Sequence, residues 1–431
     1  MAKLQALVRI PTVSHRDPAR VDTAAFDRLL AELARQFPRL HRELELTRIP
    51  THGLLFRWPG ASADRPVVLL AHLDVVPVED GWRHPPFSAA IEDGCVWGRG
   101  TLDDKGCVAA ICEAVELLLE DGHVPAQDVW LSFGCDEEVS GSAAALAVAE
   151  LTGRGVRPWF VLDEGGAVAA GAFPGVAAPV GVIGVTEKGV TSVELRVTGR
   201  GGPASTPVRG GPTARLARAI TRLDRSPMPA VVPEPTVELL RRLAPHAPLP
   251  LRPVLARIRG RALARALIAA GPESAAMTRT TFAVTTLSGS PALNVVAATA
   301  TAGVNIRVMV GDTVAGALAH LRAVIADDQV RVDVVERNEP SPLSPRDEAY
   351  ELIEATIGAV FPEAVPAPYV MMAATDSRFF TGICDRVYRF APFRMTRAQR
   401  ASIHSSDERL GIDAFTDGIR WYRRLIEGLP R

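Results

Sequence analysis

The chain has 431 residues, a formal net charge of −1 and an apolar fraction of 47%. This balance is typical of a globular protein and provides neither the basic field that nucleic acid requires nor a polybasic membrane patch. No apolar run is long enough to cross a bilayer, so we expect neither nucleic acid nor a membrane as a partner. The length exceeds that of a single hydrophobic core, which predicts two domains.

The cysteines and the N-terminus indicate the compartment. Five cysteines are scattered along the chain, and their number is odd. None lies in a CxxC spacing, so free thiols in a reducing compartment are expected. Met1–Leu7 contains no continuous apolar stretch and no cleavage site, so a signal peptide is not expected. These features predict a cytoplasmic protein.

The first part of the chain alternates strand and helix patterns. The apolar spacing predicts strands over 66–72, 129–133 and 159–162, and helices over 108–119 and 142–151. This alternation is typical of an α/β domain with a mostly parallel sheet and helices on both faces. The same mixture resumes near residue 340, so we assign 1–185 and 340–431 to one domain.

The middle of the chain, 186–339, has a different pattern. Four strand patterns and two helix patterns follow one another in β-α-β-β-α-β order, which is that of a ferredoxin-like α+β sandwich. We therefore expect a second domain inserted into the first as a lid. Residues around 227–275 are rich in proline, arginine and leucine and are predicted to form a helical insert within it.

One glycine-rich stretch carries unusual charge. Gly98–Gly106 reads Gly-Arg-Gly-Thr-Leu-Asp-Asp-Lys-Gly and places Asp103 and Asp104 directly before a predicted helix. The partial positive charge of a helix N-terminus does not neutralise two adjacent carboxylates, whereas a metal ion does. Taken alone, the stretch is more typical of a solvated acidic turn.

Other acidic and histidine residues follow predicted strands. His72 and Asp74 end the first strand, Asp136–Glu138 follow the second, and Asp163 ends the third. The carboxyl ends of parallel strands gather at one edge of a sheet, where sites form. A solvated charge cluster would not need a buried strand before each group. Together with His404, these residues are candidates for a single site.

Histidine and carboxylate ligands without thiolate suit Zn²⁺ in a catalytic site, and Co²⁺ or Mn²⁺ would also fit them. The candidates exceed the three protein ligands of one zinc and fit two ions that share Asp103: His72, Asp103, Glu138, Asp163 and His404. Two such ions lower the pKa of a water held between them, and Glu137 can accept its proton as the general base. Asp74 can bind the ring nitrogen of His72 that faces away from the metal.

These motifs resemble those of the dinuclear zinc peptidases. The family includes carboxypeptidase G, aminoacylase, acetylornithine deacetylase and succinyl-diaminopimelate desuccinylase. The likeness covers nearly the whole chain, and Thr375–Arg378, Ile403–Ser405 and the helical lid segment are most similar to the carboxypeptidase S branch. The resemblance implies that 1–185 and 340–431 form the catalytic domain, and that 186–339 form a lid of the dimerisation type.

The resemblance also implies roles for individual residues. His72 and Asp163 would hold one ion, and Glu138 and His404 the other. Asp103 would bridge both ions and would precede a cis peptide bond. Such a site belongs to a hydrolase of the amide bond next to a free carboxylate, in a dipeptide or an N-acyl amino acid. A homodimer formed through the lid is compatible with this likeness.

The lid and the C-terminal segment supply the expected substrate contacts. Asn294 matches a substrate-binding asparagine of the family, and Arg307 matches an arginine that grips the substrate carboxylate. An arginine fork is well suited to a carboxylate. Asn305 stands where the family has aspartate, which removes a charge partner from Arg307. Arg378 is expected to line the pocket or to pair with Asp376.

One departure from the family pattern concerns the oxyanion. The lid motif Gly-Gly-His reads Gly201-Gly202-Pro203 here, and proline has no donor. Losing one oxyanion donor typically reduces turnover by about 10²–10³. Three alternatives follow: another group replaces the histidine, the protein is a slow or altered hydrolase, or it is a binding protein that metal stabilises.

Overall fold

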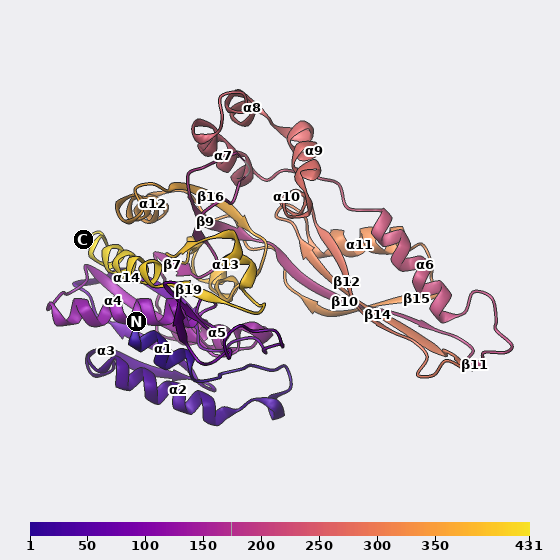
Figure 1. Ribbon diagram of the computed structural model, residues 1–431, viewed down its shortest axis with the longest axis horizontal. Helices are drawn as coiled ribbons and strands as arrows, with labels where there is room; N and C mark the ends of the chain where they lie inside the picture. The colour runs from indigo at the N-terminus through magenta and orange to yellow at the C-terminus, as the bar shows by residue number, and fades with distance from the viewer. Residues whose placement is uncertain (174) are drawn as a thin grey trace.

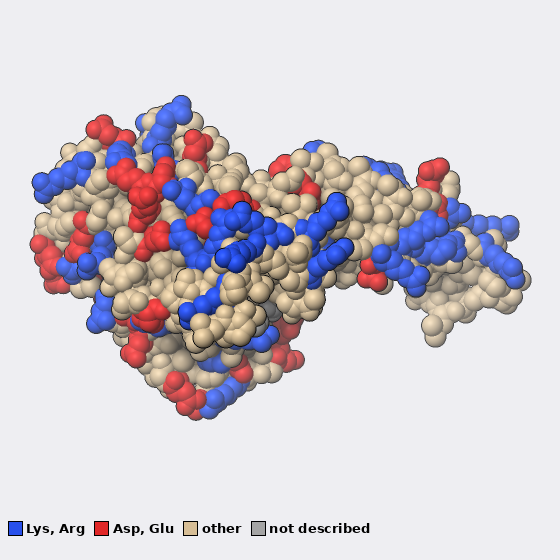
Figure 2. Space-filling model, turned by 90° about the horizontal axis from the view of Figure 1, so that it is seen from above, with Lys and Arg blue, Asp and Glu red and all other residues tan. Residues whose placement is uncertain are grey.

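The computed structural model of the chain describes residues 1–173 and 175–431. The chain forms a large lobe, which carries both termini, and an arm that projects from it (Figure 1). The space-filling view shows the same division (Figure 2). Charges of both signs are spread over the lobe, whereas Lys and Arg predominate on the visible face of the arm. No helix in the described part of the chain is long and apolar enough to cross a membrane.

The lobe is built on a ten-stranded mixed sheet. Its centre consists of four neighbouring parallel strands: β6 (Gln127–Gly134), β3 (Ser62–His72), β7 (Phe160–Asp163) and β17 (Val387–Arg389). One edge is extended in antiparallel fashion by β2 (Gly53–Trp58) and β1 (Glu45–Ile49). The other edge contains β9 (Val180–Glu187), β16 (Val365–Met371), β8 (Ala167–Ala169) and β18 (Arg394–Met395).

Helices bury both faces of this sheet. In β3, Val67, Leu69 and Ala71 join one apolar core, and Val68 and Leu70 join the other. A strand buried on both sides has a continuous apolar run instead of an alternating one, which is why β3 was recognisable from the sequence. The first core is covered by α1 (Ala2–Val8), α3 (Pro38–Glu43), α4 (Lys105–Glu120), α12 (Glu348–Val360) and α14 (Ile412–Glu427). The second is covered by α5 (Ala143–Gly153) and η4 (Asp376–Gly382), while α2 (Thr23–Gln36) contributes to both. The predicted α/β fold is confirmed.

A small sheet joins two distant segments on the lobe. Its three strands, in the order β19 (Arg409–Gly411), β5 (Cys95–Trp97) and β4 (Ala90–Glu92), are all antiparallel to their neighbours. The loop that follows β5 therefore begins beside the point where the loop that precedes β19 ends.

The arm is a four-stranded antiparallel sheet with two helices on one face. Its strands lie in the order β12 (Thr281–Ser288), β14 (Thr299–Val308), β10 (Gly189–Thr198) and β15 (Val330–Arg337). Alternate residues of β10, namely Val193, Leu195 and Val197, pack against α6 (Pro212–Arg225) and α11 (Val314–Ile325). Two short strands, β11 (Gly202–Pro203) and β13 (Val295–Val296), pair at the end of the arm farthest from the lobe (Figure 1).

The helical insert, predicted as part of the lid, packs on the lobe through its first helix. Leu239 and Leu243 of α7 (Glu234–Leu243) share a buried cluster with Val180 of β9 and Ala367 of β16. The apolar stripe of α7 thus finds its partner on the edge of the large sheet. The remaining helices of the insert are α8 (Arg252–Arg257), α9 (Gly260–Ala270) and α10 (Pro272–Ala276).

Candidate metal centre

Asp103 lies between two histidines that come from opposite ends of the chain. Nε2 of His72, at the end of β3, lies 2.9 Å from Oδ1 of Asp103. Nε2 of His404 lies 2.9 Å from Oδ2 of the same carboxylate and 3.1 Å from Oε2 of Glu138. The pairing of β5 with β19 explains the approach, since Asp103 and His404 occupy the two adjoining loops.

These donors fit a divalent metal ion. Ligand atoms of His72, Asp103 and Glu138 all lie within 4.8 Å of one another. Oε1 of Glu138 is buried without a hydrogen-bond partner, a costly state for a carboxylate unless a cation compensates it. Nδ1 of His72 lies 3.0 Å from the carbonyl oxygen of Asp74, which leaves Nε2 for a metal. The imidazole and carboxylate donors, without thiolate, match those of catalytic zinc sites.

The charges of this cluster depend strongly on one another. Desolvation lowers the pKa of His72, but hydrogen bonds with Asp103 and Asp74 outweigh it and hold that pKa well above its usual value. Hydrogen bonds with Asp103 and Glu138 raise the pKa of His404 to about 10. Desolvation raises the pKa of Asp103, yet its bonds with His404 and His72 outweigh it and lower that pKa. A cation would take the place of the two imidazole protons.

Glu137 is half-buried next to this cluster, on η2 (Glu137–Val139), which follows β6 after two residues. Desolvation raises the pKa of Glu137 well above its usual value, and the charges of Asp376 and Glu138 raise it further. The backbone amides of Glu137 and Glu138 donate to the two carboxylate oxygens of Asp74, each at 3.2 Å. Asp74 therefore contacts both His72 and the turn that carries Glu137.

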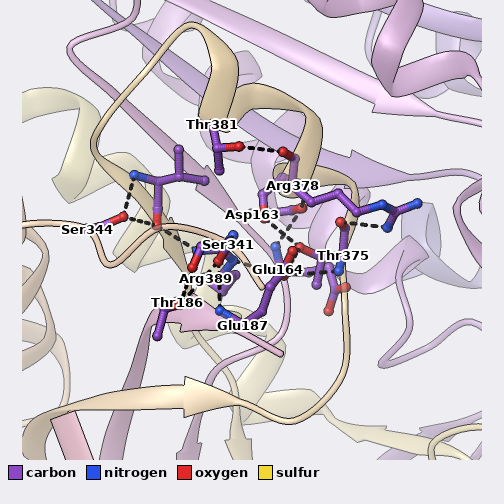
Figure 3. A network of polar contacts seen from close by, with 12 residues as sticks. Asp163, Glu164, Thr186, Glu187, Ser341, Ser344, Thr375, Arg378, Thr381 and Arg389 are labelled. Carbon is purple, nitrogen blue, oxygen red and sulfur yellow. Dashed lines mark hydrogen bonds and ion pairs between the residues drawn. The ribbon is translucent and has the colours of Figure 1, made fainter. Parts of the chain in front are cut away.

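Asp163 lies beside the three-residue group and outside it. One oxygen of its carboxylate accepts a hydrogen bond from the Glu164 amide at 2.9 Å, and the other accepts from the Ser377 amide at 2.8 Å (Figure 3). Burial raises the pKa of Asp163. Its charge also contributes to the raised pKa of Asp104 and Glu164. Asp163 thus belongs to the same acidic patch, held in place by backbone donors.

A buried network connects Asp163 to the base of the arm. Oε2 of Glu187, the last residue of β9, lies 3.2 Å from Nε of Arg389 and accepts from the amide and the hydroxyl of Thr375, each at 3.2 Å (Figure 3). Ser341, where the chain returns from the arm, accepts from the Glu187 amide through Oγ at 2.8 Å. The hydroxyls of Thr375 and Ser377 lie 2.6 Å apart. Both crossings between lobe and arm are thereby joined to the segment that binds Asp163.

The three predicted substrate residues are not brought together. Asn294 is exposed, next to β13 at the far end of the arm (Figure 1). Arg307 is half-buried on β14, with Nε 3.1 Å from Oδ1 of Asn305. Arg378 donates from Nη1 to the Thr375 carbonyl at 2.8 Å and belongs to η4, near Asp163. Asn294 therefore lies far from the metal cluster of its own chain.

Pro203 occupies the same remote end of the arm. It is exposed and pairs with Val295 between β11 and β13. Its ring supplies no donor, and its carbonyl accepts from the Thr206 amide at 3.1 Å.

Nothing in the sequence pattern singled out Glu408. This buried carboxylate lies 2.6 Å from Nη1 of Arg99 and accepts from the amides of Leu102 and Asp103 at 2.8 and 3.2 Å. Glu408 therefore holds the turn that presents Asp103. The peptide bond between Asp103 and Asp104 is cis, as the resemblance implies.

The chain is also similar to proteins of a known family. A family model described as "Peptidase family M20/M25/M40" matches residues 68–428. "Probable carboxypeptidase S-like 2" of Dictyostelium discoideum is 34% identical over 417 residues, which cover 92% of this chain and 78% of that protein. Human "N-fatty-acyl-amino acid synthase/hydrolase PM20D1" is 34% identical over 438 residues, covering 98% and 86%.

Solved structures share the fold. An M20-family metallo-carboxypeptidase of Sulfolobus solfataricus superposes with a TM-score of 0.74 at 18% identity, covering 99% of this chain and 98% of that one. A "dinuclear metal binding peptidase" of Bacillus subtilis superposes with a TM-score of 0.61 at 13% identity, covering 99% and 96%.

Proposed function

Because the chain belongs to the M20 family of metallopeptidases, we propose that it hydrolyses the amide bond next to a free carboxylate in an N-acyl amino acid or a dipeptide. The observation that carries this proposal is the position of Asp103, which faces His72 on one side and His404 on the other. Glu137, half-buried beside them and outside the group of His72, Asp103 and Glu138, is the proposed base.

Two divalent ions held by His72, Asp103, Glu138, Asp163 and His404, zinc by family expectation, would polarise the substrate carbonyl and lower the pKa of the attacking water. Glu137 accepts the proton of that water and then delivers it to the nitrogen of the leaving amine. The raised pKa of Glu137 makes it a stronger base once ionised. Asp74 keeps Nδ1 of His72 occupied, so that Nε2 faces the metal side.

Arg307 is the proposed partner of the substrate carboxylate. Lys188, at the start of the arm, has its pKa lowered to about 8 by burial and by the charge of Arg307. Desolvation also lowers the pKa of Arg307. A substrate carboxylate would compensate these two neighbouring cations. The names of the relatives agree on such a group, since a fatty-acyl amino acid and a carboxypeptidase substrate both end in a carboxylate.

The experiment is a panel of dipeptides and N-acyl amino acids, with Zn²⁺, Co²⁺ or Mn²⁺ added back to stripped protein. Chelation should abolish hydrolysis. Glu137→Gln should retain its metal content and lose at least about 10³ in turnover, whereas Glu79→Gln, at an exposed position, should behave as wild type. Full activity of Glu137→Gln would refute the proposal.

Pro203 favours a second candidate, a slow or altered hydrolase or a binding protein stabilised by metal. If the lid lacks a needed donor, Pro203→His should raise kcat on an N-acyl amino acid by at least tenfold. An unchanged kcat would mean that the histidine is replaced by another group or is not needed. Bound metal without hydrolysis of any amide in the panel would favour the binding protein.

We further propose a homodimer formed through the arm, in a reducing cytoplasm. Exposed apolar side chains on the arm support self-association, namely Leu287, Leu293, Val295, Val334 and Val335. The five cysteines are free thiols, in keeping with the proposed compartment. Light scattering on wild type and on Leu293→Asp would test the dimer, because the charged variant should dissociate.

A further inference from the structure

His404 and Asp103 both lie in loops that have no regular structure of their own. His404 stands between α13 (Arg397–Ser402) and β19, and its side chain is 53% exposed. Its backbone φ of 60° lies in the left-handed region, which residues with a side chain adopt rarely. Asp103 stands between β5 and α4. The two side chains nevertheless approach to 2.9 Å, so contacts with other residues are needed to hold both loops in place.

One buried carboxylate holds the loop of Asp103. Glu408, directly before β19, is fully buried. Its Oε1 accepts hydrogen bonds from the backbone amides of Leu102 and Asp103 at 2.8 and 3.2 Å. Its backbone carbonyl accepts from the Gly98 amide at 2.9 Å. These three bonds fix the backbone that presents the Asp103 side chain.

The other oxygen of Glu408 is joined to the loop of His404 through Arg99. Nη1 of Arg99 donates to Oε2 of Glu408 at 2.6 Å, and Nη2 donates to the carbonyl of Ser405 at 3.0 Å. Ser405 is the residue that follows His404. A single guanidinium thus binds the carboxylate that holds Asp103 and the backbone next to His404.

The ion pair of Arg99 with Glu408 is shielded from water. Arg99 is 1% exposed, and the indole of Trp82 lies over its guanidinium, with Cζ 5.2 Å from the ring centroid. Loss of either partner would leave the other as a buried charge without compensation, which is strongly unfavourable. The two loops would therefore have to rearrange to bring water or another partner to that charge.

The two proposed ions depend on these loops to different degrees. One ion takes His72 from the end of β3 and Asp163 from the end of β7, and the sheet itself holds both strand ends. The other ion takes His404, which comes from a loop and faces Oδ2 of Asp103. Displacement of the loops should therefore weaken the second ion more than the first.

We propose that Arg99 and Glu408 are positioning residues of the metal centre, and that they set its affinity for the ion on the side of His404 and Glu138. Neither side chain is a ligand, since each acts through hydrogen bonds to the two loops that carry Asp103 and His404. The inference rests on the proposed function, because that proposal supplies the two ions.

Two conservative variants test the pair. Glu408→Gln keeps an acceptor oxygen for the two backbone amides but loses the charge that Arg99 binds. Arg99→Lys keeps a positive charge but loses the fork that reaches Glu408 and Ser405 together. Changes in the groups that orient metal ligands typically cost about 10–100-fold in metal affinity. Each variant should lose that much for one ion, while its affinity for the other ion changes little.

The measurement titrates metal-stripped protein with Zn²⁺ in competition with a chromophoric chelator, which gives the affinity for each ion without any substrate. His404→Ala should lose the same ion, and adding Glu408→Gln to it should leave the affinity for the remaining ion unchanged. Wild-type affinities in both Glu408→Gln and Arg99→Lys, or an equal loss for the two ions, would overturn the inference.

Asp128→Asn is the matched control. Asp128 is also a buried carboxylate, and it accepts from Nε of Arg57 and from the Gly60 amide, each at 2.9 Å. It stands near the start of β6, however, whereas the metal centre follows the end of that strand. Asp128→Asn should lower the thermal midpoint of the stripped protein and leave both Zn²⁺ affinities unchanged. A loss of Zn²⁺ affinity as large as that of Glu408→Gln would show that general destabilisation explains both, and would overturn the inference.

Failure of this inference and failure of the proposed function give different results. Hydrolysis by wild type together with unchanged Zn²⁺ affinities in Glu408→Gln and Arg99→Lys would refute the inference alone. Selective loss of one ion in both variants, without hydrolysis of any amide by wild type, would support the inference and refute the proposed function. Should Glu408→Gln not fold, the same titration of Arg99→Lys decides.

Discussion

Nε2 of His404 lies 2.9 Å from Oδ2 of Asp103, although one residue is near the C-terminus and the other is in the first quarter of the chain. The pairing of β19 with β5 brings their loops together. Because the other oxygen of Asp103 faces His72, one carboxylate joins the two sides of the proposed centre.

Asp103→Asn should therefore remove metal from both sides of the centre. An amide cannot supply two anionic oxygens to neighbouring cations, so metal content after dialysis should fall below one ion per chain. Activity should fall by at least about 10³, in line with removal of metal-ion catalysis. Elemental analysis measures the first effect. Asp64→Asn, at an exposed position on β3, is the control, and a normal metal content in Asp103→Asn would contradict the bridging role.

Lys188 gives a pH-dependent prediction for stability. Burial lowers its pKa to about 8 in the folded chain, below the ordinary 10.5, so the unfolded chain binds more protons between these values. Stability from this group therefore rises with pH from about 8 to 10.5, and the burial cost is greatest below pH 8. Lys188→Met should be more stable at pH 7, by up to about 3 kcal/mol, with the gain shrinking as the pH approaches 10.

Denaturant unfolding at pH 7, 8, 9 and 10 measures this difference. Lys3→Met is the matched control, since Lys3 is partly exposed and paired with Glu113. If the free energy of unfolding of Lys188→Met differs from that of wild type by the same amount at every pH, burial of the charged lysine does not destabilise the fold.

The ion pair of Arg389 with Glu187 should be essential to the lobe, because both side chains are fully buried. Arg389→Met leaves the Glu187 carboxylate without its cation and should destabilise the fold by about 3–5 kcal/mol. Adding Glu187→Leu removes the unpaired charge and should recover much of the loss. Arg65→Met, which breaks an exposed pair with Glu348, should shift the urea midpoint little. Equal midpoints for Arg389→Met and Arg65→Met would contradict this account.

Gly166 should tolerate no side chain. A Cβ at this position would lie 2.1 Å from the Val182 carbonyl oxygen and 2.7 Å from that of Arg389. Gly166→Ala should thus lower the thermal midpoint strongly, because backbone on both sides must move. At Gly153, at the end of α5, a Cβ meets nothing within 4 Å, and Gly153→Ala should stabilise by about 0.4–1 kcal/mol. Equal thermal midpoints for Gly166→Ala and Gly153→Ala would contradict the prediction that Gly166 has no room for a side chain.

The residues at the strand ends were predictable because the strands that precede them have a recognisable sequence pattern. His72 and Asp163 each end an apolar run that is buried on both faces, and such runs stand out in the sequence. The glycine-rich stretch around Asp103 was conspicuous for its adjacent charges. Knowing that parallel strands end at one edge was sufficient to expect these groups near one another.

Other features depend on contacts that leave no local pattern. The strands β5 and β19 have three residues each, too few to show a period, yet they position His404. Glu408 resembles any surface glutamate until its buried partners are known. The amphipathic pattern of α7 reveals that the helix has a buried face, but not that the face rests on β16. Which sheet edge accepts a helix is decided by the shape of both surfaces.

The hydrogen bonds around Glu187 have a mechanical consequence. Glu187 and Ser341 mark the two points where the polypeptide enters and leaves the arm. They are hydrogen-bonded to each other and, through Thr375, to the segment that fixes Asp163. An arm swinging about these points would rotate on an anchored pivot. Its movement would then change the position of Arg307 relative to the lobe, while the spacing of the acidic groups around Asp163 stays constant.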